Sequence, residues 1–249
     1  MKEIVSTKNE YIKSLRALKQ HKNRVREGKF LVEGVKNVQE ALQHAKVEAV
    51  LATNESNAVV AKAQGLQVDT ILVSETVMQA VCDVKTPQEA VAVVLKEDRA
   101  LHDHGIVVLL EDVADPGNVG TIIRTASAVG AAGVVLAGDC ADYTSPKVVR
   151  SSMGSIFQVP ICMVALAAEA ILPLKEKGYT IVAGHLRGQS GMPKQPDVCL
   201  VIGNEARGIR EETEALCDYL VKINMYGEAE SLNAGVAAGI LLYRIKEGG

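Results

Sequence analysis

Aromatic residues are scarce in this chain of 249 residues, which has no tryptophan, two phenylalanines and six tyrosines. Hydrophobic residues nevertheless make up 48% of the sequence, so small aliphatic side chains must form the core. A chain of this length can bury a sizeable core in one large or two small domains. The composition therefore favours an α/β protein packed with alanine and valine over an all-β protein with an aromatic core.

The cysteines and histidines lack the spacing of a cross-linked or metal-bound framework. The five cysteines include no C-x-x-C pair, which argues against structural disulfides and against a zinc site. The five histidines form no cluster, and the "HDH" segment at 102–104 has no third ligand nearby. We therefore expect buried free thiols and no bound metal.

Long apolar segments are absent as well. No apolar run approaches the roughly 20 residues that span a bilayer. The amino-terminal segment 1–15 also lacks the apolar core of a signal peptide. We expect a cytoplasmic protein with no membrane partner.

Charge is divided unevenly along the sequence. Residues 1–36 carry ten lysines and arginines against four acidic residues, a net charge of +6, whereas the rest carries 17 against 26, a net charge of −9. A basic end of this kind suggests contact with a polyanion, and a solvated helix face explains it equally well. The candidate contacts in this segment are Arg16, Lys22, Arg24 and Arg26.

Strand and helix patterns alternate through the first 95 residues. Short apolar runs predict strands at 29–34, 47–53, 69–74 and 90–95. Apolar residues at helical spacing predict helices at 9–20, 35–45, 57–64 and 75–84. This alternation predicts a small α/β domain with a parallel or mixed sheet over residues 1–96, followed by a polar linker at 97–104.

A second alternating series fills residues 105–249 and predicts a separate α/β domain. Strands are expected at 106–111, 133–138, 157–163, 179–185, 198–204 and 219–225. Helices are expected at 118–130, 145–154, 165–178 and 231–248. The order indicates a parallel sheet with helices on both faces, and ligands of such sheets bind in the loops after the strands.

Three of those loops contain unusual polar residues. They are "EDVADPGNVG" at 111–120, "GNEARGI" at 203–209 and "NMYGEAESLN" at 224–233. None fits the G-x-G-x-x-G or G-x-x-x-x-G-K-[ST] nucleotide motifs, which argues against a nucleotide-dependent dehydrogenase. Each loop alone fits an ordinary strand-to-helix turn, but together the three loops would line one crevice.

The same loops carry a family resemblance. The segments "DPGNVGTIIRTA", "VIGNEARGI" and "INMYGEAESLNAGVAAGILLY" resemble, in this order, the three motifs of the SpoU (TrmH) family of RNA ribose 2′-O-methyltransferases, in the SPOUT superfamily. Residues 6–95 resemble the accessory substrate-binding domain of many members. The resemblance implies a trefoil knot in the carboxyl-terminal domain, S-adenosylmethionine as the methyl donor, and a homodimer formed through that domain.

The resemblance also implies a set of site residues. Gly203, Ile223 and Leu232 would contact the donor, through backbone and apolar surface. The catalytic candidates are Arg124, Asn118, Glu205, Ser231 and Asn233. Since an arginine ordinarily keeps its proton near neutral pH, we expect Arg124 to hold a phosphate and position the 2′-oxygen. Whether it also accepts the proton stays open, and for Ser231 a helix cap is an equal alternative.

The predicted function is therefore S-adenosylmethionine-dependent 2′-O-methylation of structured RNA. The accessory domain favours ribosomal RNA over transfer RNA, and a non-catalytic RNA-binding or assembly factor is the alternative from another class. Lys147 and Arg150 join the basic amino-terminal residues as candidate RNA contacts.

Overall fold

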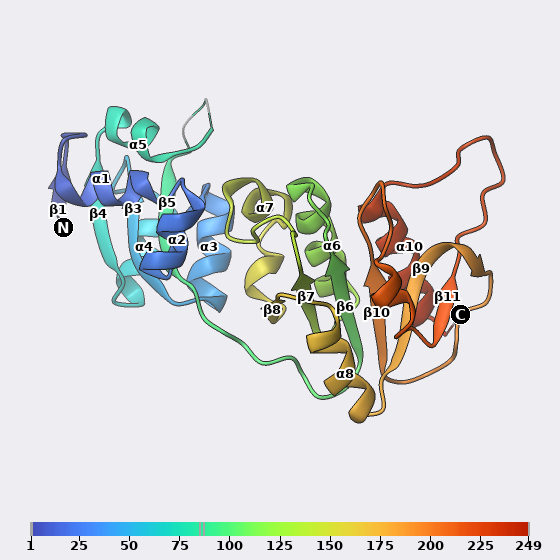
Figure 1. Ribbon diagram of the computed structural model, residues 1–249. Coiled ribbons are helices and arrows are strands. Elements are labelled where there is room, and N and C mark those ends of the chain that lie inside the picture. The colour runs from blue at the N-terminus through green and yellow to red at the C-terminus, as the bar shows by residue number, and fades with distance from the viewer. Residues whose placement is uncertain (1, 85, 87, 249) are drawn as a thin grey trace. The chain divides into compact units, whose positions relative to one another are not determined.

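The computed structural model describes residues 2–84, 86 and 88–248 and divides the chain into two compact units (Figure 1). The first unit joins Met1–Glu97 to the distant segment Thr144–Phe157, and the second joins Asp98–Tyr143 to Gln158–Gly249. The chain passes from one to the other after Glu97, in the polar segment expected to be a linker. The position of Thr144–Phe157 differs from our expectation, which had placed it in the second domain.

A mixed five-stranded sheet forms the centre of the first unit. Its order is β1 (Lys2–Ile4), β4 (Asp69–Val73), β3 (Val47–Ala52), β5 (Ala90–Leu95) and β2 (Lys29–Glu33). Strand β4 is parallel to both β1 and β3, while β5 is antiparallel to both β3 and β2. The sheet is therefore mixed, one of the two forms that the sequence predicted.

Three helices of the first unit begin where the sequence supplies a capping side chain. The helices of this unit are α1 (Glu10–Ala17), α2 (His21–Glu27), α3 (Val35–His44), α4 (Ala58–Gly65) and α5 (Glu75–Val81). Asn9, Asn57 and Ser74 accept hydrogen bonds from the first backbone N–H groups of α1, α4 and α5. Strand β1 and helix α2 had not been predicted, because β1 buries only Ile4 and α2 has no apolar stripe.

The segment Thr144–Phe157 joins the first unit through apolar contacts. Helix α7 (Pro146–Ser151) buries Val148 and Val149, and the short helix η1 (Ser155–Phe157) follows it. The Phe157 ring stacks on Phe30 of β2, with ring centroids 6.5 Å apart. The only two phenylalanines of the chain thus meet each other, which explains why this segment packs on the first sheet.

Six parallel strands form the sheet of the second unit. Its order is β11 (Tyr219–Val221), β9 (Thr180–Gln189), β10 (Val198–Ile202), β6 (Ile106–Glu111), β7 (Gly133–Ala137) and β8 (Ile161–Val164). Every adjacent pair is parallel. The parallel sheet expected for residues 105–249 is confirmed. The chain places β7 and β8 on one side of β6 and β10 on the other, so the strand order reverses beside β6.

Helices cover both faces of this sheet. Ile171 and Leu174 of α8 (Ala168–Glu176) pack in one cluster with side chains such as Val107 and Val201. Helices α6 (Pro116–Ala128) and α10 (Ala234–Lys246) contact each other, and α10 also contacts β9 and β10. Since neither α6 nor α10 contributes to the α8 cluster, they cover the opposite face. Among the described residues, no helix combines the length and hydropathy of a bilayer span.

Candidate active site

A cavity of about 460 Å³ opens at the carboxyl ends of β9, β10 and β11. The loops after β10 and β11 form much of its wall, together with the start of α10. The three residues predicted to contact a donor, Gly203, Ile223 and Leu232, all line it. Ile223 and Leu232 are only partly buried, so the cavity presents apolar surface beside exposed backbone, as small-molecule sites do.

The loop after β10 is held in a tight turn by its own polar groups. Asn204 and Gly208 exchange two backbone hydrogen bonds of 3.0 and 2.9 Å. The Asn204 Oδ1 atom accepts the N–H groups of Ala206 and Arg207. A Cβ atom on Gly203 would collide with the backbone of Gly208. Gly203 is therefore required for closing this loop as well as for leaving backbone open to the cavity.

Asn118 connects the loop after β10 to the start of α10. Its Nδ2 atom donates to Glu205 Oε1 at 2.7 Å, and its Oδ1 atom accepts from Asn233 Nδ2 at 2.8 Å. Asn118 is only 7% exposed. The structure thus brings together three of the predicted catalytic residues, one from each of the three motif loops.

The direction of these hydrogen bonds follows from the cap of α10. Asn233 is the N-cap, and its Oδ1 atom accepts the N–H groups of Gly235 and Val236. Its Nδ2 atom is therefore turned to Asn118, which leaves the Asn118 amide group facing the Glu205 carboxylate. Ser231 is exposed and lines the cavity. The helix cap that was one alternative for Ser231 is made by Asn233 instead.

Close packing of α6 on α10 brings Asn118 near Asn233. Ideal Cβ atoms on Gly235 and Gly239 would lie 3.2 Å and 3.8 Å from the Thr121 and Thr125 methyl groups. Gly235 therefore leaves room for the Thr121 methyl group, whereas a Cβ atom on Gly239 would make only an ordinary contact with Thr125. At the start of α6, Asp115 accepts the Asn118 N–H group at 2.9 Å, and Pro116 occupies the first turn. These features fix the first turn of α6 against α10.

Arg124 lies on α6, six residues beyond Asn118, or about 9 Å along the helix axis. Its side chain is exposed and has no hydrogen bond or ion pair among the described residues. The structure does not bring Arg124 into the Asn118 hydrogen bonds. Its guanidinium group is instead open to an anion from outside the chain.

The loop after β10 is anchored by two acidic residues, which were not predicted to belong to the site. Glu111 and Asp112 are buried at the end of β6. Glu111 accepts from the Thr213 hydroxyl at 2.6 Å and from the Arg210 backbone N–H at 2.8 Å. Asp112 has a left-handed φ of 55° and accepts two Arg210 guanidinium N–H groups at 2.9 Å. Two adjacent acids directly after an apolar strand were the signal for this anchor.

The Asp112 carboxylate has a pKa below its usual range. Burial acts in the opposite direction, but the Asp139 N–H group and the Arg210 guanidinium outweigh it. The Asp112 backbone carbonyl also accepts from Asn204 Nδ2 at 2.8 Å. Asp112 therefore ties both ends of the loop at 203–209 to the end of β6.

One predicted RNA contact is wrong. Arg24 is only 6% exposed, and its guanidinium donates to the carbonyl groups of Leu18 and Lys19 and to the Thr144 hydroxyl. These acceptors tie α2 to the turn before it and to the start of the α7 segment. Arg24 is thus a structural residue of the first unit and does not face a polyanion.

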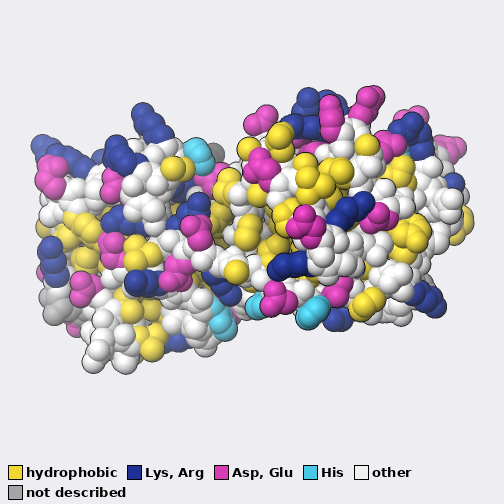
Figure 2. Space-filling model, turned by 60° about the horizontal axis from the view of Figure 1, so that its bottom comes forward, with side chains coloured by type: hydrophobic (Ala, Val, Ile, Leu, Met, Phe, Trp, Pro, Cys, Tyr) yellow, Lys and Arg dark blue, Asp and Glu magenta, His cyan; other side chains and the backbone are white. Residues whose placement is uncertain are grey.

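The other predicted RNA contacts lie at the surface of the first unit. Arg16, Lys22 and Lys147 are exposed. Arg26 pairs with Glu27 at 2.9 Å, and Arg150 lies 3.4 Å from Asp83. Figure 2 shows dark-blue basic side chains mixed with magenta acidic ones on the visible face. Acidic neighbours therefore offset part of the amino-terminal charge of +6.

Two family models match this chain. The SpoU rRNA Methylase family matches residues 105–243, and the MRM3-like substrate binding domain matches residues 9–92. The first range contains all six strands of the second sheet, and the second range contains β2, β3, β4 and the start of β5 of the first sheet.

Named relatives match nearly the whole chain. A 23S rRNA (guanosine(2553)-2'-O)-methyltransferase, RlmP, from Bacillus subtilis is 34% identical over 99% of this chain and 100% of the relative. A 23S rRNA (uridine(2479)-2'-O)-methyltransferase from Streptomyces viridochromogenes is 32% identical over 96% of this chain and 90% of the relative.

Two solved structures are also similar. The AdoMet-bound rRNA methyltransferase from Sinorhizobium meliloti has a TM-score of 0.90 and 33% identity, covering 99% of this chain and 97% of that one. The SpoU methyltransferase AviRb from Streptomyces viridochromogenes, in complex with AdoMet, has a TM-score of 0.87 and 30% identity, covering 96% and 98%.

Proposed function

The chain belongs to the SpoU rRNA methylase family, and from that premise we propose that it transfers a methyl group from S-adenosylmethionine to a ribose 2′-oxygen of ribosomal RNA. The observation that carries the proposal is the Asn233–Asn118–Glu205 chain of hydrogen bonds beside the cavity after β10. A protein that only bound RNA would have no evident need for it. The named relatives act on 23S rRNA, one at a guanosine and one at a uridine. Because the two relatives differ in the nucleotide that they modify, the proposal does not include the identity of the target base.

The cavity after β10 fits the methyl donor chemically. Ile223 and Leu232 offer apolar surface to an adenine ring, and the glycine-bearing backbone at 203–208 leaves N–H and C=O groups accessible. The charged residues that line the cavity are of both signs, with Glu205 and Glu230 beside Arg187, Arg207 and Lys222. The cavity thus combines an apolar wall and exposed backbone with carboxylates for a sulfonium cation and basic groups for the donor's carboxylate.

The residues around Asn118 prepare the acceptor side of the reaction. S-adenosylmethionine supplies a methyl carbon whose departure leaves a neutral thioether, so no metal ion is needed. The buried Asn118 amide fixes Glu205 and Asn233 before substrate binds, which lowers the reorganisation needed during transfer. Arg124, exposed on the same helix, would hold the neighbouring phosphate through its planar fork and place the 2′-oxygen in line with the methyl group.

A homodimer formed through the second unit is part of the proposal. Val236 and Tyr243 are 51% and 47% exposed. They are seven residues apart on α10 and therefore share one helix face. A second copy covering this face would also bring another chain near the start of α10. The trefoil knot and the cytoplasmic location stay predictions.

Methyl transfer is tested with radiolabelled S-adenosylmethionine and 23S rRNA, followed by mapping of the 2′-O-methyl site. We expect one modified ribose in ribosomal RNA and none in transfer RNA under the same conditions. Calorimetric titration with S-adenosylmethionine and with NAD distinguishes a methyltransferase from a dehydrogenase. Binding of RNA without any methyl transfer, in the presence of bound donor, would support the non-catalytic alternative.

A further inference from the structure

A second cavity, of about 560 Å³, lies in the first unit where β2 ends and α3 begins. We call it the α3 cavity. Its lining includes two acidic, two basic and two amide side chains, and the residues that matter for a ligand are Glu33, Gly34, Lys36, Asn37 and Arg150. The cavity is large enough for one nucleotide. It belongs to the first unit alone and is separate from the site beside Asn118.

Glu33, which lines the α3 cavity, carries a buried acceptor without a partner among the described residues. Its side chain is 4% exposed. The Oε1 atom accepts the Asp83 N–H group at 2.7 Å, whereas Oε2 has no hydrogen-bond partner among the described residues. The Arg150 Nη1 atom is 3.9 Å from Oε2, beyond hydrogen-bond distance. Because buried acceptors are nearly always satisfied, a ligand that donates an N–H group fits this position.

The start of α3 offers hydrogen-bond donors to the α3 cavity, where Glu33 offers an acceptor. Gly34 is the N-cap residue, with a left-handed φ of 96°, and no side chain caps the helix. The first N–H groups of α3 therefore have no intrahelical acceptor and carry the positive end of the helix dipole. Lys36 is exposed beside them, and Arg150 is about one-third exposed. This side of the cavity fits an anion such as phosphate.

A ligand with both an N–H donor and an anion satisfies both sides, whereas a metal ion does not. Arg150 already brings a positive charge to Glu33 and Asp83. Burial raises the pKa of Glu33 above its usual value, as expected of a carboxyl group with too few donors around it. A nucleotide has the required combination, with N–H groups on the base and negative charge on the phosphate.

We propose that the α3 cavity binds one unstacked nucleotide of the substrate RNA, with a base amino group donating to Glu33 and the phosphate at the start of α3. The inference rests on the proposed function, which supplies RNA as the ligand. Unstacked bases read on their hydrogen-bonding edges are the usual basis of sequence preference in RNA recognition. The cavity therefore favours adenine, cytosine or guanine over uracil, whose N–H group is flanked by two carbonyl oxygens.

Cytosine and uracil give a matched pair for the test, because they differ only on one edge, where cytosine has an amino group and a bare ring nitrogen and uracil has a carbonyl oxygen and a ring N–H group. The full-length protein is titrated with fluorescent hexacytidylate and hexauridylate, and binding is followed by anisotropy. We expect about tenfold tighter binding of hexacytidylate. Equal affinities for the two hexamers would overturn the proposal.

Glu33→Gln tests the acceptor directly. The glutamine oxygen would keep the Asp83 N–H bond, and its amide NH₂ group would then occupy the position of the free oxygen. We expect the preference to vanish or reverse, because this donor faces a cytosine amino group less favourably than a uracil carbonyl. A preference unchanged in Glu33→Gln, with a native circular dichroism spectrum, would overturn the assignment of Glu33.

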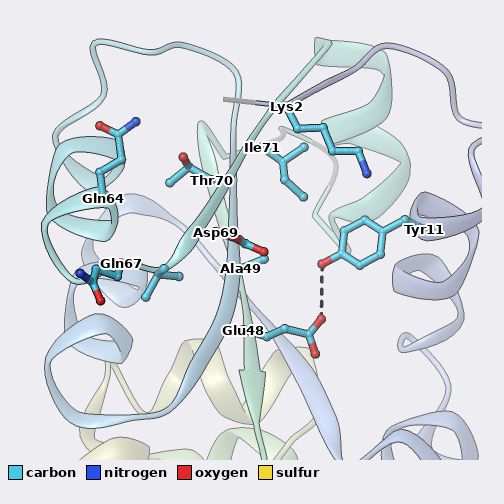
Figure 3. A pocket seen from close by; sticks show the side chains of 10 residues that line it. Lys2, Tyr11, Glu48, Ala49, Gln64, Gln67, Asp69, Thr70 and Ile71 are labelled. Carbon is cyan, nitrogen blue, oxygen red and sulfur yellow. Dashed lines mark hydrogen bonds between the residues drawn. The ribbon is translucent and has the colours of Figure 1, made fainter.

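Glu48→Gln is the matched control in the same unit. Glu48 lines another cavity, where the Tyr11 hydroxyl points to it at 3.5 Å (Figure 3). Lys29 also pairs with it at 3.0 Å, so Glu48 has no unused acceptor comparable to Glu33. We expect Glu48→Gln to leave the base preference unchanged. Loss of the preference in this control would show a general charge effect and overturn the Glu33 site.

Lys36→Ala tests the phosphate side. We expect equal weakening for both hexamers and a salt slope shallower by about one. An unchanged slope would place the phosphate elsewhere and overturn that half of the proposal. If free CMP binds as tightly as hexacytidylate, the ligand is a free nucleotide and the RNA assignment is wrong.

The outcome is separable from the proposed function. A wild-type enzyme that methylates ribosomal RNA without any base preference overturns the α3 site alone. One that shows the Glu33-dependent preference but transfers no methyl group overturns the methyltransferase assignment alone.

Discussion

Replacing Asn118 by alanine tests whether the hydrogen bonds between the three motif loops serve the reaction. The substitution removes the 2.7 Å bond to Glu205 and the 2.8 Å bond to Asn233. A hydrogen bond to a charged group contributes about 1.5–3 kcal/mol, and one between neutral groups contributes about 0.5–1.5 kcal/mol. Since Glu205 and Asn233 are exposed and can bond to water instead, we expect a loss near the lower end, about 2–3 kcal/mol.

That loss should appear in the rate of methyl transfer. If the bonds hold Glu205 and Asn233 in their reactive positions, kcat/KM for RNA falls about 30- to 150-fold. The assay is transfer of a radiolabelled methyl group to 23S rRNA, with donor affinity measured by calorimetry. We expect donor affinity to change much less than kcat/KM, because Asn118 does not line the donor cavity and reaches it only through its bond to Glu205.

The matched control is Asn57→Ala, which removes an asparagine cap from α4 of the first unit. It should cost about 1 kcal/mol of stability and leave kcat/KM unchanged. Asn118→Asp tests whether position 118 must donate a hydrogen bond to Glu205, because it would place two carboxylates, those of residues 118 and 205, at hydrogen-bond distance. Its activity relative to wild type should rise as pH falls and one proton restores the bond. Wild-type kcat/KM in Asn118→Ala would refute the reasoning.

Three other predictions follow from the same structure. Arg124→Ala should abolish methyl transfer with donor affinity unchanged, and Arg124→Lys should also be poor because an ammonium group lacks the bidentate fork; normal turnover in either variant excludes the acceptor role. Because the pKa of Asp112 is lower in the folded state, its contribution to stability is present above its unfolded pKa of about 3.9 and is lost as pH falls through the folded value. Asp112→Asn should therefore flatten the acid side of the stability curve in thermal unfolding, and an unchanged curve would contradict this. A fragment that begins at residue 98 should aggregate at micromolar concentration, because Val148, Val149 and Phe157 lose the partners that bury them; a soluble, monodisperse fragment in light scattering would count against this packing.

The helices and strands that could be predicted from the sequence are those whose own residues show a clear apolar pattern. Strands β6, β7 and β10 of the second sheet are apolar runs buried along their whole length, and each was predicted at its position. Helix α2 was missed because it buries Asn23 and Arg24 instead of an apolar stripe. From sequence alone, a basic residue is expected to be exposed. Arg24 is buried because the turn before α2 places two backbone carbonyl groups within hydrogen-bond distance of its guanidinium.

Long-range packing could not be predicted in the same way. Helix α7 was predicted near its position, but not its place in the first unit, which depends on Phe157 meeting Phe30 from more than 100 residues away. The same limit applies to Arg210 and Asp112, which form their ion pair across 98 positions. Each residue was visible in the sequence, whereas the partner that gives it a role was not.

The three motif loops divide the work of the site in a way that explains which residues the sequence could identify. The loops at 203–209 and 224–233 line the cavity directly, although each of them alone fits an ordinary strand-to-helix turn, and only the three loops together indicated a ligand site. The loop that begins α6 acts through the Asn118 side chain, which reaches Glu205 and Asn233. Arg124 extends from the same helix with no partner among the described residues. Under the proposed function its partner would come from outside this chain, and an RNA phosphate would supply the charge and geometry that its guanidinium requires.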